Sequence, residues 1–199
     1  MSLFNSLDLT TTSKMSNQKG TIDIIMGCMF SGKSTELIRL ANRYKVLEVP
    51  LLIVNHSLDN RYHESAIATH SNIKMDCLSI NSLDMIKNKY LSNYEESQVI
   101  IIEEAQFFKG LFDFVINACE TDGKNVIVVG LDGDSNRCKF GEILDLIPVC
   151  DSVKKLYGLC VQCKDGTKAC FTKRLVENNE QVFIGSSEFQ AVCRKHYLE

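Results

Sequence analysis

The sequence predicts an α/β fold in which helices cover both faces of a parallel sheet, followed by a small C-terminal module. Three observations support this prediction. Apolar runs typical of buried strands alternate with segments of helical periodicity over residues 20–150. A glycine-rich loop joins the first expected strand to the first expected helix. Cysteines at metal-ligand spacing occur after residue 151.

The elements of the first domain follow from the spacing of its apolar residues. The expected strands are near-continuous apolar runs, as in strands that are buried on both faces. The first expected helix instead places Leu37, Leu40, Ala41 and Tyr44 on one side. The predicted strands are 21–27, 50–55, 73–80, 98–104 and 125–133, and the predicted helices are 33–47, 82–90 and 110–121.

Composition and charge limit the classes of function. The chain has 199 residues, of which 45% are hydrophobic, so it can form one domain with a core and a small addition. The net charge is −3 without a long basic run, so we expect no nucleic-acid partner. No apolar stretch approaches the roughly 18 residues of a membrane span, so we expect no membrane partner.

The N-terminal residues 1–19 are rich in Ser, Thr and Asn and are predicted to form a flexible tail. They lack the basic start and the apolar region of a secretory signal, which predicts a cytoplasmic protein. In such a reducing compartment, closely spaced cysteines among the nine are expected to bind metal or serve catalysis rather than form disulfides.

The loop GCMFSGKS fits the phosphate-binding pattern G-x-x-x-x-G-K-[ST], known as the P-loop. Its glycines let backbone N–H groups turn toward phosphate oxygens, and the following helix adds the positive end of its dipole. Lys33 can reach the β- and γ-phosphates of ATP, and Ser34 can bind Mg²⁺. A strand before the loop and a helix after it favour this interpretation over a chance turn. The predicted ATP-binding residues here are Gly27, Cys28, Met29, Phe30, Ser31, Gly32, Lys33 and Ser34.

Two adjacent acids, Glu103 and Glu104, end the predicted strand 98–104. Ligands of parallel sheets bind at the carboxyl ends of the strands, so both acids can face the phosphates. One can contact the coordination shell of Mg²⁺, and the other can accept a proton from an attacking hydroxyl group. The alternative is a pair of solvated acids, which the strand and the P-loop disfavour. Together, these features predict a P-loop domain of RecA-like type at residues 20–150.

Four potential metal ligands occur in two pairs of equal spacing. Cys160 and Cys163 form a CxxC pair, and Cys193 and His196 form a CxxH pair. Three sulfurs and one imidazole suit a structural Zn²⁺, because they fill all four tetrahedral positions. The alternative is a redox CxxC pair near an unrelated cysteine. We expect a zinc-binding module at residues 151–199.

Six segments occur together in a fixed order: GCMFSGKSTELIR, DNRY, IIIEEAQFF, VIVVGLDG, FTKRL and VCRKHY. Together they resemble the type II thymidine kinase family of cells and large DNA viruses, over residues 20–198. The resemblance implies transfer of the ATP γ-phosphate to the 5′-hydroxyl of thymidine in nucleotide salvage, with deoxyuridine as a second candidate acceptor. It also implies a homotetramer and feedback inhibition by dTTP.

The resemblance further implies roles for single residues. Glu104 corresponds to the general base, and Glu103 corresponds to an acid, normally Asp, that serves Mg²⁺. The longer side chain of Glu103 is expected to alter the contact to the metal. Asp59 and Arg61 correspond to residues near the transferring phosphate, where Arg61 and Lys33 offset negative charge. Without the resemblance, LDNRY would indicate an ordinary Asp-Asn turn.

The resemblance also implies a thymine pocket closed by the lasso, residues 181–185, whose backbone groups hold the edge of the base. Three departures from the family occur. Ser135 replaces a usual aromatic residue, Phe189 replaces a common Tyr, and the stretch before the CxxH pair is one residue shorter. The missing ring is expected to loosen the pocket. The predicted substrate-binding residues are Phe107, Leu131, Ser135, Phe140, Thr172, Gln181, Val182, Phe183, Ile184, Gly185 and Phe189.

Two rival functions remain open to test. A RecA-like ATPase that moves on nucleic acid would show DNA-stimulated ATP turnover, but the short length and acidic balance disfavour it. A zinc-ribbon binding module with a degenerate P-loop is disfavoured by the intact Lys33, Ser34 and Glu104.

Overall fold

The computed structural model describes residues 19–59, 66–68, 74–177, 180–183 and 185–199. Its centre is a six-stranded sheet in the order β5-β2-β6-β7-β1-β8. Every pairing in this sheet is parallel, which confirms the predicted fold class. The strands are β1 (Ile22–Gly27), β2 (Leu51–His56), β5 (Leu78–Ile80), β6 (Val99–Glu103), β7 (Asn125–Gly130) and β8 (Ser152–Leu156).

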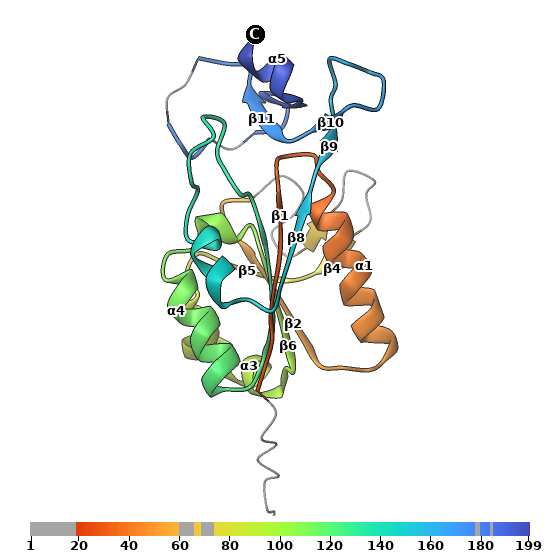
Figure 1. Cartoon of the computed structure of the whole chain (residues 1–199). Coiled ribbons are helices and arrows are strands. Elements are labelled where there is room, and N and C mark those ends of the chain that lie inside the picture. The colour runs from red at the N-terminus through yellow and green to blue at the C-terminus, as the bar shows by residue number, and fades with distance from the viewer. Residues whose placement is uncertain (1–18, 60–65, 69–73, 178–179, 184) are drawn as a thin grey trace, which may run out of the picture.

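Helices cover both faces of this sheet, as Figure 1 shows with α1 on one side and α3 and α4 on the other. Side chains alternate along a strand, so Ile101 of β6 packs toward α1 while Ile100 and Ile102 pack toward the opposite layer. No helix in the described part of the chain combines the length and the apolar character that a membrane span requires. The helices are α1 (Lys33–Val46), α2 (Asp84–Lys89), α3 (Leu91–Glu96), α4 (Leu111–Ile116) and α5 (Arg194–Leu198), with the 3₁₀ helices η1 (Ala105–Phe107) and η3 (Ile143–Val149) and the π-helix η2 (Asn117–Thr121).

Two predicted elements differ from the structure. The predicted strand 73–80 is divided, because β4 (Lys74–Asp76) pairs with β3 (Ala66–Ala68) outside the main sheet and only β5 joins β2. The predicted helix 110–121 is helical throughout, but its second half is the π-helix η2. In addition, α3 is a short helix that the sequence did not predict. The predicted tail lies outside the described residues except for Lys19.

The edge strand β8 lies within residues 151–199, the range predicted for the C-terminal module. Residues 152–156 nevertheless pair with β1 and belong to the main sheet. The segment SVKKL is polar and mostly exposed, as expected for an edge strand, so it lacks the apolar run that marks the inner strands. Lys154 of this strand binds Glu36 of α1 at 2.7 Å, which ties the sheet edge to the helix layer.

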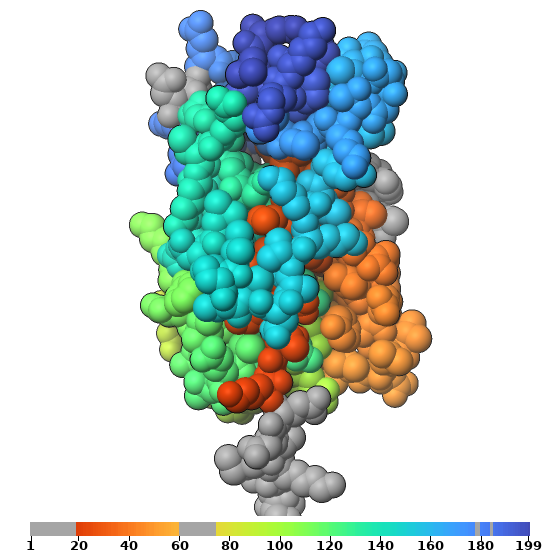
Figure 2. All heavy atoms as spheres, viewed as in Figure 1, coloured from red at the N-terminus to blue at the C-terminus, as the bar shows by residue number. Residues whose placement is uncertain are grey.

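The C-terminal module follows β8. It contains two small antiparallel ribbons and α5, and its buried cluster holds only five residues. Figures 1 and 2 show the module, in blue, at one end of the molecule, next to the loop that joins β1 to α1. The ribbon strands are β9 (Gly158–Leu159) with β10 (Lys168–Ala169), and β11 (Phe171–Arg174) with β12 (Phe189–Val192).

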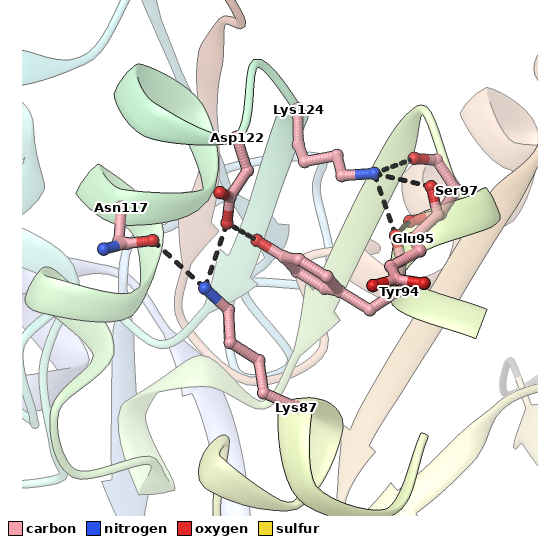
Figure 3. Close-up of polar contacts among 7 residues, drawn as sticks. All are labelled: Lys87, Tyr94, Glu95, Ser97, Asn117, Asp122 and Lys124. Atoms are coloured by element: carbon pink, nitrogen blue, oxygen red, sulfur yellow. Dashed lines mark hydrogen bonds and ion pairs between the residues drawn. The ribbon is translucent and has the colours of Figure 1, made fainter. Parts of the chain in front are cut away.

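A polar network holds α3 against the main domain (Figure 3). The hydroxyl of Tyr94 donates to Asp122 at 2.5 Å, and Asp122 also pairs with Lys87 at 3.0 Å. The ammonium of Lys124 donates to the backbone oxygens of Tyr94 at 2.9 Å and Ser97 at 2.5 Å, and to a third at 3.1 Å. The last carbonyls of a helix have no partners inside the helix, so Lys124 completes the end of α3.

We expect Lys124→Met to destabilise the protein, because the methionine leaves these carbonyl oxygens without their donor. The free energy of unfolding in a urea titration should fall by about 1–3 kcal/mol. Lys109→Met, at an exposed lysine, is the matched control and should change it by less than about 0.5 kcal/mol. Equal stability of the two variants would contradict this role for Lys124.

Candidate active site

One cavity of about 240 Å³ lies where the P-loop, the carboxyl ends of β6 and β7, and the C-terminal module meet. It brings together most of the residues predicted from sequence, although they are spread over much of the chain. Of the predicted set, the lining includes Met29, Phe30, Ser31, Gly32, Lys33, Ser34, Asp59, Glu103, Glu104, Phe107, Leu131, Ser135, Phe140, Thr172, Gln181, Phe183, Gly185 and Phe189.

Five predicted residues fall outside this lining. Arg61 and Ile184 lie outside the described residues. Gly27, Cys28 and Val182 are described but do not line the cavity. Conversely, five lining residues had no predicted role, although all but Asp134 lie within the segments that carry the resemblance: Thr35, Gln106, Gly133, Asp134 and Arg174.

The two glycines of the P-loop, Gly27 and Gly32, have different roles. A side chain at Gly27 would overlap the carbonyl oxygen of Leu156 in β8, so only glycine fits there. Gly32 has φ 83° and lies directly before α1, which begins at Lys33. The ammonium of Lys33 donates to the carbonyl oxygen of Cys28 at 2.8 Å, across the loop. Burial lowers the pKa of Lys33, and the carboxylate of Glu104 opposes this shift.

Glu103 ends β6 next to the start of α1. Its Oε1 accepts the hydroxyl of Ser34 at 2.5 Å, while its buried Oε2 has no hydrogen-bond partner among the described residues. Burial, and then the charge of Glu104, raise the pKa of Glu103 to about 8. A cation would offset both effects, and hydroxyl and carboxylate oxygens are ligands that Mg²⁺ prefers. The residues present therefore fit a magnesium ion held with the phosphates.

Glu104 sits on a tight turn between β6 and η1. Its backbone is left-handed, with φ 52° and ψ 40°, and its carbonyl oxygen accepts the N–H of Phe107 at 3.0 Å. This turn directs the carboxylate into the cavity rather than along the sheet. Oε2 of Glu104 accepts a hydrogen bond from the side-chain amide of Gln106 at 2.5 Å.

Four aromatic rings from outside the P-loop line the cavity. Phe107 and Phe140 meet edge to face with their centroids 5.5 Å apart. Phe183 and Phe189 do so at 5.9 Å, and the guanidinium of Arg174 lies 5.5 Å and 5.4 Å from their centroids. Mostly apolar walls with a few fixed polar groups are typical of a pocket for a flat organic ring.

A side chain, rather than the backbone alone, attaches the lasso to the rest of the site. Nε2 of Gln181 donates to Oδ2 of Asp134 at 2.8 Å and to the carbonyl oxygen of Lys139 at 3.1 Å. The other oxygen of Asp134 accepts two backbone N–H groups of its own turn. Val182, the next lasso residue, is exposed and does not line the cavity.

The position that lacks the family's aromatic residue is occupied by a buried serine. The carbonyl oxygen of Ser135 accepts the hydroxyl of Tyr197 from α5 at 2.7 Å. The loop that carries Ser135 is thereby fixed to the C-terminal helix, while Phe107 and Phe140 supply rings elsewhere in the lining.

Two hydrogen bonds connect the P-loop to the C-terminal module. The backbone N–H of Met29 donates to the hydroxyl of Thr172 at 3.0 Å. The thiol of Cys28 donates to the carbonyl oxygen of Ala169 at 3.4 Å. The side chain of Cys28 therefore faces the module and not the cavity, and burial raises its pKa.

The four predicted metal ligands form one cluster, with all ligand atoms within 4.8 Å of one another. Nδ1 of His196 lies 3.4, 3.3 and 3.4 Å from the sulfurs of Cys160, Cys163 and Cys193. The sulfurs of Cys163 and Cys193 are 3.8 Å apart. Tetrahedral coordination at zinc bond lengths of about 2.0–2.3 Å would place ligand atoms roughly 3.5–3.8 Å apart, so the cluster can hold such an ion.

Fold and site together define a P-loop phosphotransferase: a phosphate loop, a cation site and a second carboxylate share one cavity with a ring-binding pocket. A sequence model of the thymidine kinase family matches residues 20–197. The chain belongs to the thymidine kinase family.

Curated relatives agree with this family. A rice protein named thymidine kinase is 40% identical, and the match covers 90% of this chain and 67% of the rice protein. A thymidine kinase of Yaba monkey tumor virus is also 40% identical, covering 93% of this chain and 98% of the viral protein. A chicken protein named cytosolic thymidine kinase is 37% identical, covering 91% of this chain and 78% of the relative.

The metal cluster yields a direct prediction. Metal analysis of the purified protein should find about one zinc ion per chain, and Cys163→Ser should lose most of it because one of four ligands is removed. Cys170→Ser, at an exposed cysteine outside the cluster, is the control and should keep the metal. Well under one zinc per wild-type chain would contradict the assignment.

Proposed function

We propose that the protein is a thymidine kinase that transfers the γ-phosphate of ATP to the 5′-hydroxyl of thymidine, giving dTMP for nucleotide salvage. The observation that carries this proposal is the single cavity, which places the P-loop, Glu103 and Glu104 beside an aromatic pocket. Membership in the thymidine kinase family supports the same reaction. Deoxyuridine, which lacks only the methyl group of the base, is the second candidate acceptor.

The P-loop provides the donor half of the reaction. Its backbone N–H groups and the start of α1 face the phosphates, and Lys33 is poised to move from Cys28 to the β- and γ-phosphates. Ser34 and Glu103 would hold Mg²⁺, which neutralises phosphate charge when bound. Asp59 also lines the cavity, and the resemblance assigns Arg61 to stabilising the transferred phosphoryl group.

Glu104 provides the acceptor half. Its carboxylate accepts the proton of the 5′-hydroxyl as the oxygen attacks the γ-phosphorus, while the bond from that phosphorus to the β–γ bridging oxygen breaks and ADP leaves. The rings of Phe107, Phe140 and Phe189 hold the base. Thr172 and the lasso contact the edge of the base. The enzyme thus lowers the barrier mainly by positioning the two substrates and stabilising charge.

Several wider features are proposed on the same basis. The domain reaches to about residue 156, and the zinc module that follows closes the nucleoside pocket. The family resemblance supports a homotetramer and feedback inhibition by dTTP. The name of the chicken relative supports a cytoplasmic location.

The reaction is tested with purified wild-type protein and Glu104→Gln, incubated with ATP, Mg²⁺ and each nucleoside. The wild type should form dTMP from thymidine. Glu104→Gln should lower kcat by roughly 10²–10⁴-fold, because the amide cannot accept the hydroxyl proton. Glu96→Gln, at an exposed acid in α3, should turn over like the wild type.

Two outcomes would contradict the proposal in different ways. If thymidine and deoxyuridine both remain unphosphorylated while ATP is hydrolysed, the protein is not a thymidine kinase. If Glu104→Gln keeps near wild-type kcat, the reaction stands but Glu104 is not its base.

A further inference from the structure

Gln106 is a buried polar residue that no motif assigns to the reaction. It lies in the middle of η1, two positions after Glu104, and is only 3% exposed. A buried primary amide needs hydrogen-bond partners for its oxygen and its nitrogen. Gln106 has both, and they come from two different walls of the cavity.

The two ends of this amide have fixed places. Oε1 of Gln106 accepts the backbone N–H of Leu131 at 2.9 Å. Nε2 donates to Oε2 of Glu104 at 2.5 Å. If the amide were reversed, its NH₂ group would face the N–H of Leu131 and its oxygen would face the carboxylate of Glu104. Neither contact is a hydrogen bond, because a backbone N–H only donates and a carboxylate only accepts. The network therefore permits one orientation.

Two glycines make room for Gln106. A Cβ at Gly130 would lie 2.6 Å from Oε1 of Gln106. A Cβ at Gly141 would overlap the backbone carbonyl oxygen of Gln106. Gly130 ends β7 directly before Leu131, so the end of β7 is shaped around this side chain. The close approach at Gly130 restricts the side-chain amide, while the close approach at Gly141 restricts the backbone of η1 at Gln106.

We propose that Gln106 is a positioning residue, which holds the carboxylate of Glu104 toward the acceptor hydroxyl. Its second hydrogen bond, to Leu131, fixes the position of that carboxylate relative to the wall of the nucleoside pocket. Glu104 occupies a left-handed turn, which a non-glycine residue keeps only when its surroundings hold it there. The hydrogen bond from Gln106 restrains the side chain on that turn. This inference rests on the proposed function, because it takes Glu104 to be the base.

The kinetic test uses Gln106→Leu, which removes both hydrogen bonds and keeps a side chain of similar size. With ATP and thymidine, kcat should fall by roughly ten- to a hundredfold, because the base is less often in place. The thymidine KM should change by less than about threefold. The control is Gln98→Leu, which should keep wild-type kinetics. Gln98 is exposed and directly precedes β6, whereas Glu104 directly follows it.

A double-mutant cycle separates positioning from a general structural role. In a Glu104→Gln background the carboxylate is already absent, so adding Gln106→Leu should lower kcat by less than about twofold more. An equal loss in both backgrounds, or wild-type kcat in Gln106→Leu, would overturn the proposal.

Two further results keep the test decisive. If circular dichroism shows that Gln106→Leu does not fold, Gln106→Met replaces it under the same criteria, because methionine is unbranched and adapts to irregular spaces. A wild-type protein that leaves thymidine unphosphorylated overturns the proposed function. Unchanged kcat in the Gln106 variants of an active enzyme overturns only the inference.

Discussion

The hydrogen bond from the backbone N–H of Met29 to the hydroxyl of Thr172 joins the two halves of this site. Met29 belongs to the loop after β1, and Thr172 belongs to β11 of the C-terminal module. Thr172 is 5% exposed and the hydrogen bond is partly buried, so loss of the hydroxyl would leave the N–H of Met29 without this partner. Since the cavity is lined from both sides of this contact, the site depends on it.

The metal cluster explains how so small a module can hold Thr172 in place. Strand β11 pairs with β12, and Cys193 and His196 directly follow β12. A zinc ion bound there would link the end of β12 to the turn after β9, and so fix the ribbon that carries Thr172. The module's own core is small. Its buried members are Cys160, Ala169, Ala191, Val192 and Cys193.

Local sequence patterns predicted the features that depend on neighbouring residues. The apolar runs of β6 and β7, the P-loop spacing and each of the two metal-ligand pairs lie within one short segment. The missed features depend on contacts between distant segments. Edge strand β8 has no apolar run, Cys28 turns toward Ala169 of the module, and the amide of Gln106 joins two loops. The sequence does not indicate which hydrogen-bond partners a glutamine within a motif will have in the folded protein.

If the module supports the phosphate loop, Thr172→Val should bind a non-hydrolysable ATP analogue more weakly than the wild type does. Valine keeps the shape of threonine but removes the oxygen that accepts the N–H of Met29. Calorimetry without thymidine should show the analogue binding roughly tenfold more weakly, with fold and zinc content retained. Wild-type affinity for the analogue would show that the phosphate loop does not depend on the module.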